Sequence, residues 1–365
     1  MTAAWSAASA ADGSSADWPT ADGRLERGYR RLLFAYPRRH RHRHGTELVT
    51  TLLEMAAPGQ RHPRIGDALH LVASGLRLRF RLPAGRPMLA LAALLTALTM
   101  GGFGAAAGSW LGAQTFADLP DDAAMARIMQ QAGDERGGTP PHRSASPWHA
   151  DSIHSTAYGV GGWDAEQTRQ RFAADGWSVS GFTPVSGKSV TGHEDGTTTE
   201  TTLSGAQFTV ESEGLLVNVR GYSEGFVSVF GGPTRTAAFL PLVVVGTAVG
   251  LVVGWLIAAA VAYRLVAAPP GRRVTAAGLW GLALLALALP AVALYGNVMR
   301  VFRDGSADDA PALTVHSAFN PGEYYPFGPS WLVLGLSIAG LVVAAATVLA
   351  ARPGEQPPQP AAVAG

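Results

Sequence analysis

The chain has 365 residues, of which 47% are hydrophobic and only 15% are charged, with 28 basic and 27 acidic side chains. This charged fraction is low for a soluble protein, so the apolar residues must be concentrated in particular segments. The absence of cysteine excludes disulfides, thiolate metal sites and cysteine nucleophiles.

The first 87 residues precede any long apolar segment. Residues 1–22 are rich in Ser, Ala and Asp and lack apolar periodicity, so we expect a disordered leader. Residues 23–87 carry apolar side chains at helical spacing, which predicts a small helical domain. Its three runs are Leu25, Tyr29, Leu32 and Tyr36, ended by Pro37; Leu48, Leu52 and Met55; and Ile65, Leu69, Val72, Leu76 and Phe80.

This N-terminal region is strongly basic. It holds fourteen Arg against seven acidic residues, which by the positive-inside rule places it in the cytoplasm. Basic side chains next to a membrane entry point favour contact with anionic lipid, and we expect no nucleic-acid partner. The predicted lipid-contacting residues are Arg77, Arg79, Arg81 and Arg86.

Four later blocks are apolar on all sides and have about the 20 residues needed to cross a bilayer. None of them contains Asp, Glu, Lys, Arg or His, which argues against an ion-coupled carrier. We therefore expect a mainly α membrane protein with four transmembrane helices, at 88–112, 238–263, 274–298 and 331–351.

The segments between these helices alternate in charge. A loop at 264–273 contains Arg264, Arg272 and Arg273, and the tail at 352–365, expected to be disordered, begins with Arg352. Both are predicted to be cytoplasmic, which places both termini on the cytoplasmic side of the membrane. Outside lie a domain with fifteen acidic and eight basic residues and a shorter loop, although Arg300 and Arg303 are exceptions to the rule; these two segments are 113–237 and 299–330.

The outer segment 113–237 predicts a small α+β domain. A short helix is expected at 121–131 and a linker at 133–147. A second helix should begin after Asp164, because Asp at the cap and Gln167 three residues later can satisfy free backbone donors. Alternating apolar residues then predict an antiparallel meander, at Trp177 and Val179, Phe208 and Val210, Leu215 to Val219, and Phe226 to Phe230.

Two of the apolar blocks carry glycines at intervals of four residues. Small residues along one stripe of a helix allow close approach of a second helix within a membrane. We expect these stripes to form a helix-pairing face or a face for a homo-oligomer or another protein, although a chain rich in Ala and Gly also places some glycines this way by chance. They are Gly104, Gly108 and Gly112, and Gly246, Gly250 and Gly254.

Candidate chemistry is sparse. His149, Asp151 and His154 are the best metal-like cluster, since imidazole and carboxylate are suitable zinc ligands. Polar residues are also expected next to a linker, so we treat the cluster as a weak candidate. No catalytic residue or cofactor site is predicted.

The basic region resembles a known sequence motif. It contains Arg30, Arg31, Leu32, Leu33, Tyr36, Pro37, Arg38, Arg39, Arg43, Gly45, Glu47, Leu48, Leu52, Leu53 and Glu54. This stretch is similar to a cytoplasmic prefix found in many actinobacterial integral membrane proteins, and a related prefix precedes some permeases that pair with an ABC transporter ATPase. The resemblance implies a bacterial plasma membrane and no defined activity.

Three functions are consistent with these patterns. The leading hypothesis is a non-enzymatic membrane protein with an extracytoplasmic binding or sensing domain coupled to a basic cytoplasmic domain. The alternative is a permease-like subunit of an ABC-type transporter, although its short connection between spans two and three leaves little room to engage an ATPase. An extracytoplasmic metal-dependent hydrolase is the third.

Overall fold

A computed structural model describes residues 23–57, 59–133, 139–192, 197–223, 225–303, 312–320 and 329–351. The expected leader at 1–22 and tail at 352–365 lie outside these residues. The chain divides into two compact units: the first ends at Leu82 and the second begins at Pro83.

The first unit is helical, as predicted. It contains α1 (Gly23–Leu32), the single 3₁₀ turn η1 (Leu33–Ala35), α2 (Arg38–Glu54) and α3 (Ile65–Phe80). Pro37 separates η1 from α2, because proline cannot continue a helix but is suited to precede one. The helices share a small core made of Leu25, Tyr29, Leu33, Tyr36, Val49 and Leu71.

The predicted apolar face of α3 is wrong. The helix buries Leu71 and Gly75 instead. A Cβ added at Gly75 would lie 2.8 Å from the carbonyl carbon of Ala35, so the absence of a side chain allows η1 to approach the α3 backbone. Close backbone approach therefore decided which face of α3 turned inward, and it left Ile65, Leu69 and Leu76 exposed. Met55, expected on the apolar face of the second helix, is also exposed, after the end of α2.

The second unit contains a six-stranded antiparallel sheet with the order β1-β2-β6-β5-β4-β3. The predicted meander is confirmed as β3 (Ser178–Gly192), β4 (Thr198–Ser212), β5 (Leu215–Tyr222) and β6 (Phe226–Pro233). Two further strands, β1 (His142–Ser146) and β2 (His149–Tyr158), were not predicted, and β1 lies within the expected linker. Their polar composition concealed the alternation, because most of β1 is exposed.

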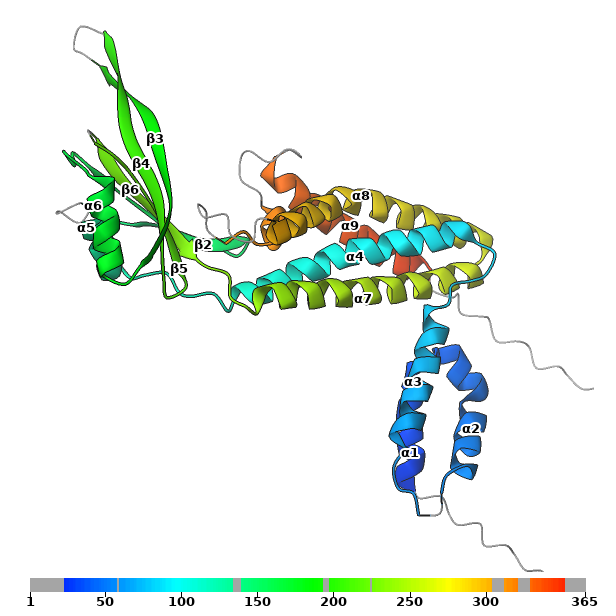
Figure 1. The fold of residues 1–365 in the computed structure, drawn as a ribbon. Helices are drawn as coiled ribbons and strands as arrows, with labels where there is room; N and C mark the ends of the chain where they lie inside the picture. Colours follow the sequence, from blue (N-terminus) through cyan, green and yellow to red (C-terminus); the bar gives the residue numbers. More distant parts are fainter. Residues whose placement is uncertain are drawn as a thin grey trace, which may run out of the picture. The chain divides into compact units, whose positions relative to one another are not determined.

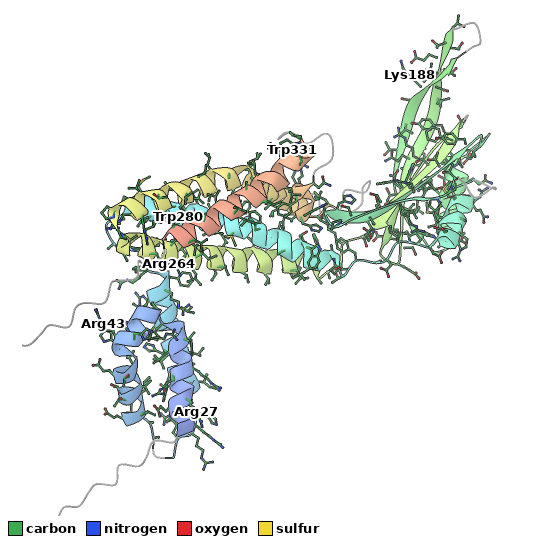
Figure 2. The ribbon with its side chains drawn as sticks, turned by 180° about the vertical axis from the view of Figure 1, so that it is seen from behind. Arg27, Arg43, Lys188, Arg264, Trp280 and Trp331 are labelled. Carbon is green, nitrogen blue, oxygen red and sulfur yellow. The ribbon has the colours of Figure 1, made fainter. Side chains whose placement is uncertain are left out.

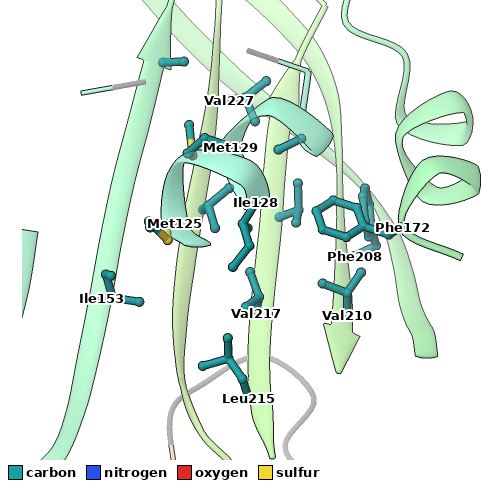
Figure 3. Packing of buried hydrophobic residues seen from close by; sticks show 14 of the residues in the cluster. Met125, Ile128, Met129, Ile153, Phe172, Phe208, Val210, Leu215, Val217 and Val227 are labelled. Carbon is teal, nitrogen blue, oxygen red and sulfur yellow. The ribbon is translucent and has the colours of Figure 1, made fainter. Parts of the chain in front are cut away.

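Two short helices pack on this sheet, α5 (Asp122–Gln131) and α6 (Ala165–Ala174) (Figure 1). Helix α6 begins at the predicted cap, because Asp164 accepts a hydrogen bond from Gln167 N at 2.8 Å. Helix α5 is capped in the same way by Asp121, which was expected to be the first residue of the helix and accepts a hydrogen bond from Ala124 N at 2.7 Å. Figure 3 shows how their apolar side chains meet those of the strands to form the domain core, among them Met125, Ile128, Met129, Phe172, Phe208, Val210 and Val217.

Within the described residues, four helices are long and apolar enough to cross a membrane. They are α4 (Pro87–Ala113), α7 (Phe239–Ala267), α8 (Pro270–Arg303) and α9 (Ser330–Ala350). Two hydrogen bonds join α8 to α4. Trp280, labelled in Figure 2, donates from Nε1 to Thr96 Oγ1 at 3.1 Å, and Tyr295 Oη donates to the Leu98 carbonyl at 3.0 Å.

The boundaries of two helices differ from those expected. Helix α7 continues to Ala267 and α8 begins at Pro270, so most of the predicted loop at 264–273 is helical. At its other end α8 continues to Arg303, into the segment expected to be loop. Apolarity marks only the part of a helix suited to a bilayer, whereas backbone hydrogen bonding carries the helix beyond it.

Candidate functional site

The three residues proposed as a weak metal site do not converge. His149, Asp151 and His154 all lie on β2, where alternate side chains point to opposite faces, so His154 faces away from the other two. His154 Nε2 instead lies 3.1 Å from Ser228 Oγ. Among the described residues no group of three or more His, Asp or Glu side chains could hold a metal ion.

The two glycine stripes face each other. Helices α4 and α7 lie side by side (Figure 1), in contact along the residues Gly104, Gly108, Gly112, Gly246, Gly250 and Gly254. A Cβ added at Gly104 would lie 2.1 Å from the carbonyl oxygen of Gly246, and one added at Gly246 would lie 2.3 Å from that of Gly104. The stripes therefore pair two helices of the same chain, and their glycines are occupied in that contact.

One of the four arginines expected to contact lipid has a different environment. Arg79 Nη2 donates to the backbone carbonyls of Phe34, at 2.5 Å, and Tyr36, at 3.3 Å. This side chain thus holds η1 against α3 within the first unit. Arg77, Arg81 and Arg86 are exposed.

A buried polar cluster that the sequence analysis did not identify lies where α4 meets η2 (His316–Phe319). Ser109 Oγ on α4 accepts a hydrogen bond from Val315 N at 2.8 Å and lies 3.1 Å from His316 Nδ1. Because Ser109 Oγ already accepts one bond, its own hydrogen can be donated to a neutral imidazole. Both side chains are buried, so this contact is shielded from water.

Helix α8 supplies the other side of the cluster. Asn297 Nδ2 donates to Ser317 Oγ at 3.0 Å and to the Thr314 carbonyl at 3.4 Å. Ser317 Oγ in turn donates to the same carbonyl at 2.7 Å. Residues 312–320 are thereby fastened to α4 by Ser109 and to α8 by Asn297, two helices that are far apart in the sequence.

The sheet domain contacts this cluster through the turn between β1 and β2. The ring of Trp148 packs edge-on against Phe319, with ring centroids 6.0 Å apart, and Phe319 packs on Phe103 of α4 at 5.8 Å. We call these three rings and the hydrogen-bonded residues Ser109, Asn297 and 314–317 the junction. Phe319 is half-buried within the junction.

The electrostatics of the junction keep His316 neutral. Burial, and then the nearby His149 on β2, lower the pKa of His316 from 6.5 to about 4. At neutral pH its imidazole is therefore uncharged and can pair with Ser109.

Only weak signals in the sequence could have indicated the junction. Asn297 is a polar residue near the end of an apolar block, where a buried amide requires partners. Ser109 is a small residue between two glycines of the stripe, and nothing in the local pattern pairs it with His316. No protein family, curated protein or solved structure matches the chain.

Proposed function

We propose that the chain is a non-enzymatic protein of the plasma membrane whose sheet domain, outside the cell, binds or senses a ligand. The basic helical unit lies in the cytoplasm in this arrangement. Charge supports the orientation. Arg264, Arg272 and Arg273 flank the turn between α7 and α8, whereas residues 113–237 carry fifteen acidic against eight basic side chains.

An accessible part of the sheet domain is the ribbon formed by the outer ends of β3 and β4. Strand β5 pairs with β4 only as far as Gly205, whereas β3 and β4 remain paired to Gly192 and Thr198. The ribbon extends beyond the rest of the sheet (Figure 1), and Lys188, which bonds Glu200 at 2.7 Å, lies on it (Figure 2). Its polar faces and the free edge of β3 are suited to receiving a ligand by strand addition.

The observation that carries the proposal is the junction. It joins the sheet domain to the helix bundle at a third place, in addition to the two chain connections at α4 and α7. A force or displacement of the β1–β2 turn reaches η2 through Trp148 and Phe319, and then α4 and α8 through Ser109 and Asn297. Such a connection couples binding outside to helix packing within the membrane.

The geometry favours this function over the two alternatives. A permease needs cytoplasmic structure that engages an ATPase, but only residues 268–269 separate α7 from α8. The hypothesis of a metal-dependent hydrolase requires a metal site at His149, Asp151 and His154, and these side chains do not converge.

The orientation is tested by labelling single cysteines, because the chain contains none of its own. Ser189→Cys on the ribbon and Gly271→Cys beside the α7–α8 turn are treated in intact cells with a membrane-impermeant maleimide. We expect labelling at position 189 alone, and at both positions after lysis. Labelling of position 271 in intact cells would contradict the proposal.

The coupling is tested by hydrogen exchange in the purified full-length protein. Trp148→Ala should accelerate exchange in residues 312–320, because it removes the ring that packs on Phe319. Phe182→Ala on β3, where the side chain is half-exposed, serves as the matched control and should leave that segment unchanged. Equal exchange in wild type and Trp148→Ala would refute transmission through the junction.

A further inference from the structure

A pocket lies at the end of the bundle where α7 turns into α8. Its volume is about 320 Å³, within the range of small-ligand sites. The start of α4 contributes Met88 and Leu89, and the ends of α7 and α8 contribute Leu265 and Ala277. The walls are therefore apolar, and the pocket takes in side chains from three of the helices.

Two arginines also line this pocket, Arg86 and Arg273. Arg273 is held in place by the end of α7: its Nε donates to the Leu265 carbonyl at 3.1 Å, and its Nη2 donates to the carbonyls of Val266 and Ala268 at 3.1 and 3.2 Å. These bonds hold the guanidinium against the end of α7. A guanidinium fixed in this way is organised in advance for an anion.

No Asp or Glu on the helices that line the pocket balances these arginines. There is no Asp or Glu in residues 68–117 or 225–303, which include α4, α7 and α8. Two more cations, Arg264 and Arg272, are exposed at the same end of the bundle (Figure 2 labels Arg264). The charge of the site is therefore complementary to an anion.

Apolar walls at the end of membrane-crossing helices and cations beside them fit an amphiphile with an anionic head. Basic pockets between transmembrane helices bind phospholipid head groups in this way. We propose that the pocket binds one anionic phospholipid, with its phosphate on Arg86 and Arg273 and an acyl chain along Met88, Leu265 and Ala277. This inference rests on the proposed membrane insertion and is independent of any ligand of the sheet domain.

The test measures binding of phosphatidylglycerol to the full-length protein by native mass spectrometry from detergent. Arg86→Gln should weaken binding about fivefold, the effect of removing one cation from a lipid contact. Arg300→Gln, an exposed arginine near the other end of α8, is the matched control and should bind as wild type does. Ala277→Phe fills the apolar wall and should also weaken binding, with both arginines intact.

The following results would overturn the proposal. Equal affinity for phosphatidylcholine, or unchanged binding in both Arg86→Gln and Ala277→Phe, would show that the pocket does not select the lipid. Displacement of the lipid by inorganic phosphate at equal concentration would assign the site to free phosphate. Membrane insertion itself is tested separately, by fractionation of the wild-type protein. Failure of that protein to fractionate with membranes would refute insertion, whatever the variants bind.

Discussion

Ser109 Oγ lies 3.1 Å from Nδ1 of His316, although 207 positions separate the two residues in the chain. The same oxygen accepts the backbone N–H of Val315, so one hydroxyl holds both the side chain and the backbone of residues 312–320 against α4.

Replacing this serine should destabilise the protein. Ser109→Ala leaves the buried Val315 N–H without its acceptor, at a cost of about 1–3 kcal/mol. Ser337→Ala is the matched control, because Ser337 is also buried in an apolar helix but bonds only to the Val333 carbonyl of its own helix. Thermal unfolding in detergent should show a lower midpoint for Ser109→Ala alone; equal midpoints would contradict the role assigned to Ser109.

Acid should weaken the protein through His316. Its pKa is about 4 in the folded chain and about 6.5 when unfolded, so between these values the unfolded state binds a proton that the folded state does not. Stability is therefore highest above pH 6.5 and falls as the pH decreases toward 4. The unfolding midpoint measured between pH 7 and pH 4.5 should fall less in His316→Gln than in wild type, and parallel curves would exclude His316 as the cause.

The contact between α4 and α7 should not tolerate a side chain at Gly104. Gly104→Ala places a Cβ against the Gly246 carbonyl, which is backbone and cannot move aside, and overpacking of this kind costs about 1–3 kcal/mol. Gly296→Ala on α8 is the control, because an added Cβ there has no described heavy atom within 4 Å. The denaturant midpoint should decrease in Gly104→Ala only.

Arg79 and Arg77 should differ although both were expected to contact lipid. Arg79→Ala removes charge-assisted hydrogen bonds to the carbonyls of Phe34 and Tyr36, each worth about 1.5–3 kcal/mol. Hydrogen exchange in residues 33–36 and 71–80 should accelerate in this variant. Arg77→Ala should leave exchange unchanged, because the side chain is exposed; equal effects would show that Arg79 does not hold η1 to α3.

Local chemistry explains which elements could be predicted. Helix caps such as Asp121 and Asp164 act within three residues, and apolar runs of bilayer length identify themselves, so these features are visible in the sequence. Strands β1 and β2 were missed because they are ordered by pairing, β1 with β2 and β2 with β6, rather than by an apolar pattern of their own.

By itself, the sequence determined four apolar helices, a helical basic unit and an antiparallel meander, because each depends on residues close together in the chain. Only the tertiary structure decided that the two glycine stripes meet, that α3 turns Gly75 rather than Leu69 inward, and that Ser109 pairs with His316. These contacts join distant segments, and packing selects among the many pairings that the same local patterns permit.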